Sequence, residues 1–136
     1  MKQQCPCHSG KPYPSCCKPF HQGSNPPNAL LLMRSRYAAY ALSLADYIIQ
    51  TTHPLNPHYQ QNPPKWRLDI LHFTQQTAFL GLKIIEFIGG NTEAFMTFTA
   101  TLQLKHSQQD VSFTEKSSFL KLENHWLYRD GQHRPH

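Results

Sequence analysis

The sequence predicts an α+β fold in which two or three helices precede a four-stranded antiparallel sheet. Two observations carry this prediction. Apolar residues recur at three- and four-residue steps from residue 29 onward, as on one face of a helix, and beyond residue 80 apolar and polar residues alternate, as in a half-buried strand. In 136 residues, 39% of them hydrophobic and 12% aromatic, there is material for one core and a small N-terminal appendage.

All four cysteines lie in the appendage, within the stretch CPCHSGKPYPSCC: Cys5, Cys7, Cys16 and Cys17. The adjacent Cys16 and Cys17 pair only through a strained ring, and Cys5 with Cys7 is nearly as awkward. A redox pair has the pattern C-x-x-C at a helix start beside a sheet, whereas this segment has C-P-C and C-C with no strand signal nearby. A closed site of four thiolates around one structural Zn²⁺ fits the pattern best, because a segment too short for its own core needs such a staple. Disulfides or free thiols remain the alternative.

The predicted location is the cytoplasm. The start MKQQCPCHSG lacks the apolar stretch of a secretory signal, and no apolar run approaches the roughly 18 residues of a membrane-spanning helix. Disulfides rarely persist in a reducing compartment, so this prediction favours the metal site over cross-linked thiols.

The stretch GSNPPN, residues 23–28, predicts a linker and the start of a helix, with Pro27 or Asn28 near the first turn. The apolar positions of this helix follow in three- and four-residue steps: Leu30, Met33, Tyr37, Tyr40 or Ala41, and Leu44. We expect one helix or a helix pair that continues through ADYIIQTT and ends at His53, because a residue before proline avoids the α region.

A second helical segment and the strands follow a loop, HPLNPHYQQNPP. The stretch KWRLDILHFTQQ predicts a short amphipathic helix with Trp66, Ile70 and Phe73 on one face. The stretches LGLKIIEFI, EAFMTFTATLQL, VSFTEKSSFLKL and HWLYRD predict four strands. GGN marks the first hairpin turn, and Glu123–Asn124 marks a tight turn between the last two strands.

Two charged residues are expected to meet inside this fold. Arg34 lies within the apolar stripe of the first helix, and Glu115, Ser117 and Phe119 share one face of the third strand. Since Phe119 suggests that this face is the inner one, we expect Arg34 to pair with Glu115, because a buried charge needs a partner.

This pairing has two interpretations. It fixes the helix on the sheet and serves only structure, or it belongs to a small polar pocket. The candidate pocket residues are Arg34, Tyr37, Glu115, Ser117 and Trp126. His53 is a candidate base at the pocket mouth. The sequence has no Ser-His-Asp, paired-acid or phosphate-loop pattern, so the residues leave open whether the protein is an enzyme.

The positive charge is concentrated at the front of the chain. Five basic residues precede the first acidic residue, Asp46: Lys2, Lys11, Lys18, Arg34 and Arg36. Residues 1–45 therefore carry the whole net charge of +5. This asymmetry favours an anionic partner, such as RNA, anionic lipid or an acidic protein surface; the alternative is a surface whose charge serves only solubility.

The cysteine stretch C-P-C-x-S-G-x-x-Y-x-x-C-C resembles the SEC-C motif, a small zinc-binding tail first noted in the SecA translocation ATPase. The resemblance implies Cys5, Cys7, Cys16 and Cys17 as ligands, with Ser9, Gly10 and Tyr13 at supporting positions. His8 stands where the motif usually has glycine, so a positive φ there would cost some strain. His8 and His21 are alternative ligands.

The blocks SGKPYPSCCKPFHQG, LMRSRYAAYALSLADYIIQTTHP, EKSSF and HWLYRDG together resemble the YchJ-type bacterial family. That family joins an N-terminal SEC-C motif to a domain similar to nuclear transport factor two, a curved sheet wrapped around helices to form a cone. The resemblance implies a SEC-C-like zinc-binding segment at residues 1–24 and a cone-shaped α+β domain at residues 25–136. It implies a fold and no particular activity.

Two functions follow as hypotheses. In the first, the chain is a zinc-binding interaction protein whose basic N-terminal knob, within residues 1–45, docks on an acidic protein or on the ribosome. In the second, it binds a small molecule, or acts as a minor enzyme, in the cavity of the cone.

Overall fold

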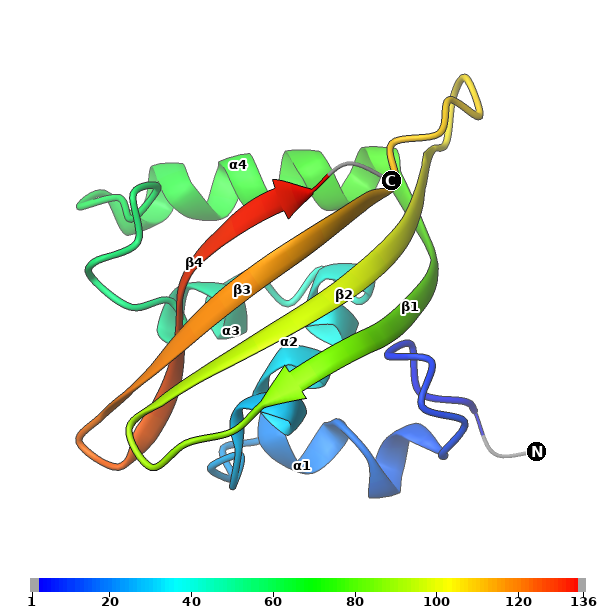
Figure 1. Cartoon of the computed structure of the whole chain (residues 1–136). Helices are drawn as coiled ribbons and strands as arrows, with labels where there is room; N and C mark the ends of the chain where they lie inside the picture. The colour runs from blue at the N-terminus through cyan, green and yellow to red at the C-terminus, as the bar shows by residue number, and fades with distance from the viewer. Residues whose placement is uncertain (1–2, 135–136) are drawn as a thin grey trace.

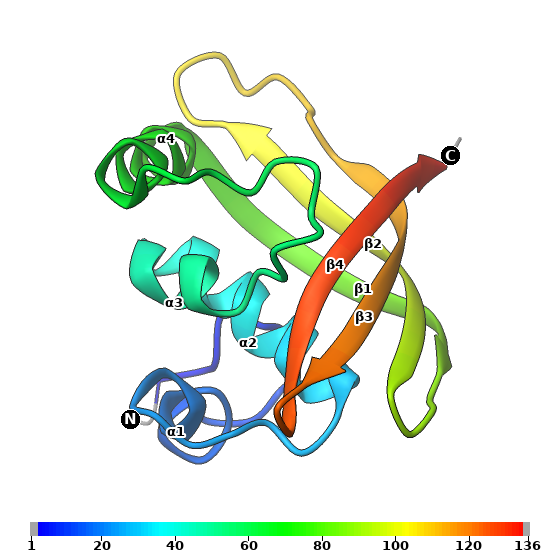
Figure 2. The same cartoon turned by 90° about the vertical axis from the view of Figure 1, so that its left-hand side faces the viewer.

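A curved antiparallel sheet forms the frame of the molecule and wraps around the helices on its concave side (Figure 1, Figure 2). The computed structural model describes residues 3–134. The strands are β1 (Thr77–Ile88), β2 (Glu93–Leu104), β3 (Phe113–Leu122) and β4 (His125–Arg134). They lie in chain order, β1-β2-β3-β4, and each pairs antiparallel with the next. This confirms the predicted four-stranded meander.

The sheet curves where its registers shift. In the β1–β2 pair the register shifts between Phe79 and Gly81 and again between Ile84 and Glu86. Such irregularities bend a strand and increase its twist. The β3–β4 hairpin turns through Glu123 and Asn124 at φ 49° and 69°, as a two-residue hairpin turn requires, so the predicted tight turn is confirmed.

The first predicted helix is a helix pair, α2 (Ala29–Ala41) and α3 (Ala45–Gln50). Asn28 caps the start of α2, where its Oδ1 accepts a hydrogen bond from the Leu31 amide at 2.9 Å. The helix ends because Ser43 adopts φ 59°, and the Leu44 amide donates back to the Ala39 carbonyl at 2.8 Å. This left-handed ending satisfies a terminal carbonyl and turns the chain into α3.

The second predicted helix is α4 (Pro63–Gln76), which begins two residues earlier than expected and is capped by Asn62. Trp66 and Ile70 are buried as predicted, whereas Phe73 is 41% exposed. Strand β1 follows α4 without a loop, so the strand begins earlier than the alternation after residue 80 indicated. Among residues 3–134, no helix has the length and apolar character that a membrane crossing requires.

The cysteine segment contains two short helical turns that the sequence pattern did not predict, η1 (Tyr13–Ser15) and α1 (Lys18–His21). Helix α1 packs against η1 and beside α2, at the end of the molecule opposite α4 (Figure 1).

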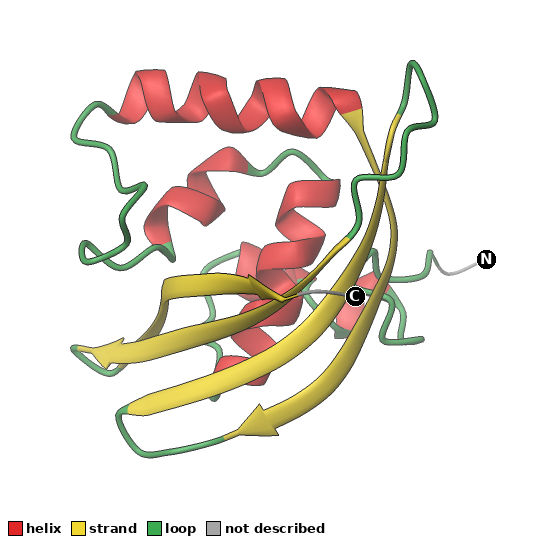
Figure 3. Ribbon diagram, turned by 45° about the horizontal axis from the view of Figure 1, so that its top comes forward, coloured by secondary structure: helices red, strands yellow, loops and turns green. Residues whose placement is uncertain are grey.

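The main core lies between α2 and the concave face of the sheet (Figure 3). Every second residue of β2 from Ala94 to Leu102 is buried there. On β3, Glu115, Ser117 and Phe119 are 8%, 0% and 0% exposed. The prediction that these three side chains face inward is therefore confirmed, and it places a carboxyl group in the core.

Candidate functional site

The four cysteines come together in a tight N-terminal loop. The Cys5 amide donates to the Lys11 carbonyl at 2.9 Å, and the Cys16 amide donates to the Tyr13 carbonyl at 3.0 Å, which closes the loop from both sides. His8 and Gly10 turn the chain at φ 62° and 86°. His8 thus occupies the strained conformation that the motif comparison anticipated.

The sulfur atoms are spaced as ligands of one ion. All four Sγ atoms lie within 4.8 Å of one another. The Cys7–Cys16 and Cys16–Cys17 sulfur distances are 3.6 and 3.9 Å. A tetrahedral site with metal–sulfur bonds of about 2.3 Å has sulfur–sulfur edges of about 3.8 Å. The residues therefore fit a four-sulfur metal centre.

The two alternative histidine ligands are engaged elsewhere. His21 Nε2 donates to the Ser35 carbonyl at 2.8 Å, so its Nδ1 accepts from the Tyr13 hydroxyl at 2.7 Å. Burial lowers the pKa of His21, which favours this neutral form. The His8 ring packs edge-on against Tyr37 at 5.7 Å between centroids. Within the described residues, neither histidine belongs to the metal-ligating group.

The pKa values of the clustered thiols differ from one another in a way that favours binding of a cation. Hydrogen bonding from Cys17 lowers the pKa of the Cys7 thiol to about 4. Burial raises the pKa of Cys5 to about 11, and the hydrogen bond to Cys7 raises the pKa of Cys17. Without a cation, ionisation of Cys7 therefore keeps these neighbours protonated, and a bound divalent ion would supply the charge that lets all four act as thiolates.

Arg34 supports this loop and does not pair with Glu115. Its Nη1 donates to the Cys7 carbonyl at 3.0 Å, on the side of α2 that faces the cysteines. The predicted Arg34–Glu115 pair is therefore wrong. On a helix, side chains three or four residues apart share a face, and Arg34 shares the face of Ala38, which packs on the cysteines.

Arg36 is the arginine that enters the core. It is 5% exposed, and its Nη1 donates to the Ile48 carbonyl at 3.1 Å, to Thr51 Oγ1 at 2.7 Å and to Thr52 Oγ1 at 3.2 Å. Its guanidinium lies over the Tyr128 ring, 4.7 Å from the centroid. The sequence therefore predicted the wrong arginine. Met33, Arg36 and Tyr40 follow the same three- and four-residue spacing as the apolar positions around Arg34, so periodicity alone fits both arginines equally well.

Glu115 is held by hydroxyl groups. Ser117 and Tyr128 both donate to its Oε2, the latter at 3.0 Å, and His133 Nε2 lies 3.4 Å from its Oε1. Burial, with the nearby charge of Glu115, raises the pKa of Tyr128, so that the phenol stays protonated and donates. Gly131 on β4 leaves the space that this carboxyl group fills, since a Cβ there would overlap it.

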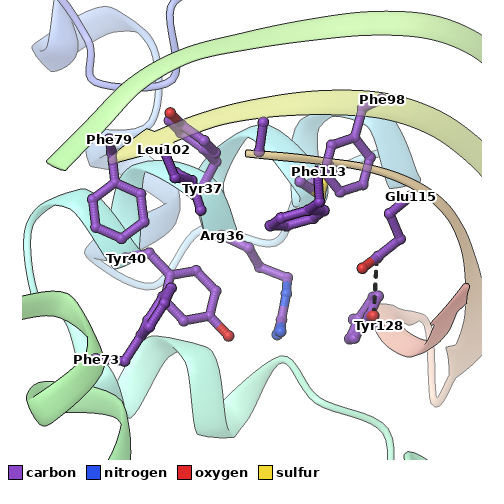
Figure 4. A pocket seen from close by; sticks show the side chains of 12 residues that line it. Arg36, Tyr37, Tyr40, Phe73, Phe79, Phe98, Leu102, Phe113, Glu115 and Tyr128 are labelled. Carbon is purple, nitrogen blue, oxygen red and sulfur yellow. Dashed lines mark hydrogen bonds between the residues drawn. The ribbon is translucent and has the colours of Figure 1, made fainter. Parts of the chain in front are cut away.

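Arg36 and Glu115 line a central cavity of about 190 Å³ between α2, α4 and the sheet. Figure 4 shows the guanidinium reaching from α2 into this space, with aromatic rings around it. A second hollow of about 270 Å³ shares Arg36, Tyr40, Glu115 and Tyr128 with the first, and Asn56, His58 and Asp130 also line it. We call the first hollow, which is mainly aromatic, the interior, and the second, which has more polar residues, the mouth.

The structure brings two of the five predicted pocket residues together at this cavity. Tyr37 and Glu115 line the cavity. Ser117 lies behind Glu115 as a hydrogen-bond donor. Trp126 lines a separate hollow between the end of α3 and the β3–β4 turn, and Arg34 lies at the cysteine loop.

His53 has a structural role in the described geometry. Its amide donates to the Tyr128 carbonyl at 2.8 Å, and its Nδ1 accepts from the Leu55 amide at 3.0 Å. His58 and His133 line the mouth, and His53 is not among its lining residues. The loop after α3 turns at Asn56, whose Oδ1 accepts a hydrogen bond from the His58 amide at 2.8 Å, within the segment that the sequence predicted as a loop.

Comparisons with known proteins agree with this architecture. A family model described as YchJ, middle NTF2-like domain, matches residues 28–131. A UPF0225 protein of Photorhabdus laumondii is 39% identical over 134 residues, which cover 96% of this chain and 81% of that protein.

Two solved structures are also similar. The solution structure of a SEC-C motif containing protein from Rhodopseudomonas palustris has a TM-score of 0.79 and 28% identity, and the match covers 99% of this chain and 100% of that one. The crystal structure of a SEC-C motif containing protein from Psychrobacter arcticus has a TM-score of 0.78 at 24% identity, over 98% of this chain and 84% of that one. The second similarity concerns the fold alone.

Proposed function

The chain belongs to the YchJ-type family, in which a SEC-C motif precedes an NTF2-like domain, and we propose that it is a zinc-stabilised protein that binds a small molecule in its central cavity. The observation that carries this proposal is the cavity itself, in which a buried arginine and a buried glutamate face aromatic walls without forming a direct ion pair. Concave apolar sites with a few convergent polar groups are where proteins bind small ligands.

Zinc is the ion that suits the cysteine cluster. Four thiolates in a tetrahedral arrangement favour Zn²⁺, and a site with four protein ligands has no open position for substrate. Cys5, Cys7, Cys16 and Cys17 would hold the ion, which would cross-link the loop as a structural centre. The four cysteines are unpaired by disulfides, which is the state that the predicted cytoplasmic location requires. We also propose that the chain divides into a zinc-binding segment, residues 1–24, and a cone-shaped α+β domain, residues 25–136.

A ligand explains the cavity better than a purely structural role. A structural ion pair would bring Arg36 and Glu115 into contact, yet no ion pair joins them among the described residues. Protein cores are otherwise packed with few voids, and this one retains space beside two ionisable groups. These features support the second of the two hypotheses drawn from the sequence.

The test is a screen of neutral, cationic and anionic fragments by ligand-observed NMR on the intact protein. The matched variant is Ala100→Leu, because Ala100 lines the aromatic interior and is 2% exposed. We expect fragments that bind the wild type to lose their signals in the variant, since a leucine fills part of the space. A screen with no binders, or with binders unaffected by Ala100→Leu, contradicts the proposal.

Docking through the basic front is a second proposal. Lys11 and Lys18 are exposed beside the cysteine loop, which favours it. Its support is weaker than the sequence indicated, because Arg34 and Arg36 are turned inward to Cys7 and to the cavity. Lys2 lies outside the described residues.

Cosedimentation with purified ribosomes tests the docking proposal. Binding that falls steeply between about 50 and 200 mM salt is expected, as for any contact to phosphates. The double variant Lys11→Gln with Lys18→Gln should weaken it, whereas Lys105→Gln, an exposed lysine after β2, should not. Equal cosedimentation of all three proteins, or none at low salt, contradicts ribosome docking.

A further inference from the structure

The unused donors of Arg36 point to the class of ligand. An arginine has five N–H donors, of which two are on Nη1. Within the described part of the chain, every hydrogen bond of Arg36 starts from Nη1. No fully buried side-chain nitrogen there lacks a partner, so Nη2 and Nε must border open space. That space is the cavity, which the guanidinium enters in Figure 4.

The charge of Arg36 also lacks a direct counter-ion. Glu115 is the acidic residue that lines both hollows, and Tyr128 stands between the two groups, with its ring against the guanidinium and its hydroxyl on the carboxylate. Asp130 lines the mouth and accepts a hydrogen bond from the Gly131 amide at 2.7 Å. A buried cation gains most from an anion in direct contact, and within residues 3–134 no carboxylate provides it.

The shape of the cavity sets the size of the ligand. An apolar protein cavity of about 150 Å³ holds one benzene ring, and the interior measures about 190 Å³. Its aromatic walls are Tyr37, Tyr40, Phe73, Phe79, Phe98 and Phe113. Because Arg36 belongs to both hollows, a ligand would place an apolar body in the interior and an anionic group at the junction.

We propose that the ligand is a small monocarboxylate with an aromatic or branched apolar body, and that the Nε–Nη2 edge of Arg36 binds its carboxylate. This inference rests on the proposed function. A guanidinium edge presents two parallel donors that match the two oxygens of a carboxylate. A phosphate ester fits less well, because the cavity offers one arginine and no lysine, and Glu115 would repel a dianion.

The experiment uses three probes of similar shape on the intact, metal-loaded protein: 3-phenylpropionate, 3-phenylpropanamide and phenyl phosphate. Calorimetry measures affinity, and NMR follows the Nε–H resonance of Arg36. We expect the propionate to bind at least about tenfold more tightly than the amide, the increment of one charge-assisted hydrogen bond, and to shift the Nε–H resonance. The amide and the phosphate should leave that resonance in place.

A substitution of Arg36 separates the effect of its positive charge from the effect of its two-donor edge. Arg36→Lys keeps the charge and loses the two-donor edge, so the propionate should bind at least about tenfold more weakly. Arg67→Lys is the control and should leave the affinity unchanged, because Arg67 lies on α4 in an exposed pair with Asp46 of α3. The wild-type Nε–H shift gives the answer even where Arg36→Lys fails to fold.

Four outcomes would overturn the carboxylate assignment, and one of them would overturn the proposed function as well. Equal affinity for propionate and amide, or an unmoved Nε–H resonance on binding, overturns the carboxylate assignment and leaves the cavity as a binding site. Absence of propionate binding while other fragments bind overturns it in the same way. A fragment screen with no binders overturns both the assignment and the proposed function.

Discussion

Gly131 is the residue that makes room for a carboxylate in the core. It pairs with Ser117 across the β3–β4 ladder, and a Cβ at this position would overlap the carboxyl group of Glu115 and the hydroxyl of Tyr128. Its φ lies outside the left-handed region, so space alone limits substitution. Gly131→Ala should therefore lower the free energy of unfolding by about 1–3 kcal/mol, the usual cost of overpacking.

Urea denaturation measures this cost, and Gly89→Ala is the matched control. A Cβ at Gly89 would meet the Phe87 ring at an ordinary 3.5 Å, so the control should unfold like the wild type. Equal midpoints for Gly131→Ala and the wild type would show that Glu115 does not occupy the space described.

Tyr37 makes stability depend on alkaline pH. Burial raises the pKa of Tyr37 to about 12, while its hydroxyl donates to the Gly81 carbonyl at 2.8 Å. In the unfolded chain a tyrosine has a pKa of about 10. Since the folded pKa is the higher one, the contribution of Tyr37 is complete below about pH 10 and is lost as the pH rises toward 12.

We therefore expect the urea midpoint to fall between about pH 10 and pH 12, and to fall less steeply in Tyr37→Phe, which has no proton to lose at this position. The measurement is the slope of the urea midpoint against pH, compared between the wild type and Tyr37→Phe. Parallel slopes would mean that Tyr37 is not buried against the sheet as described.

At the scale of elements, α2 and the cysteine loop are joined by Arg34. Its bond to the Cys7 carbonyl fixes a ligand-bearing segment, and partners of this kind typically change metal affinity by about 10- to 100-fold. Arg34→Met should accordingly weaken zinc binding by about tenfold or more in competition with a chromophoric chelator.

Arg67→Met is the control for loss of an arginine, since Arg67 lies on α4 in an exposed pair with Asp46. It should bind zinc as the wild type does. Identical zinc affinities for Arg34→Met and Arg67→Met would remove Arg34 from the metal centre.

The elements also explain which predictions succeeded. Strand alternation placed Glu115 inward because β3 has one buried and one partly exposed face. Helical periodicity could not choose between Arg34 and Arg36, because α2 is covered on most sides and residues 35–39 are all buried. The sequence did not predict where α2 ends. The chain turns at Ser43 in a left-handed conformation, and glycine is the residue that usually marks such a turn.

At the scale of the whole molecule, the cysteine cluster and the cone-shaped domain have separate cores. Three of the four cysteines form a buried cluster with Ala38, apart from the core between α2 and the sheet. Removal of zinc by a chelator should therefore expose the amides of residues 3–22 to hydrogen exchange and leave the strands protected. Loss of protection throughout the sheet on chelation would mean that the metal holds the entire fold.

The two candidate sites differ in how far the sequence could predict them. The four candidate metal ligands lie within thirteen residues, so their spacing alone predicted the site. The cavity depends on the register of four strands against α2 and α4. Such long-range geometry leaves no local pattern, so the sequence predicted only Tyr37 and Glu115 among the residues that line the interior.

The measurement that tests the central claim most directly is zinc-edge X-ray absorption on the purified protein, calibrated for metal content. The account predicts one zinc per chain, surrounded by four sulfur atoms at about 2.3 Å, with Cys5, Cys7, Cys16 and Cys17 as the source of all four. A protein without zinc and with four free thiols, or a spectrum that requires nitrogen ligands in place of sulfur, would contradict it.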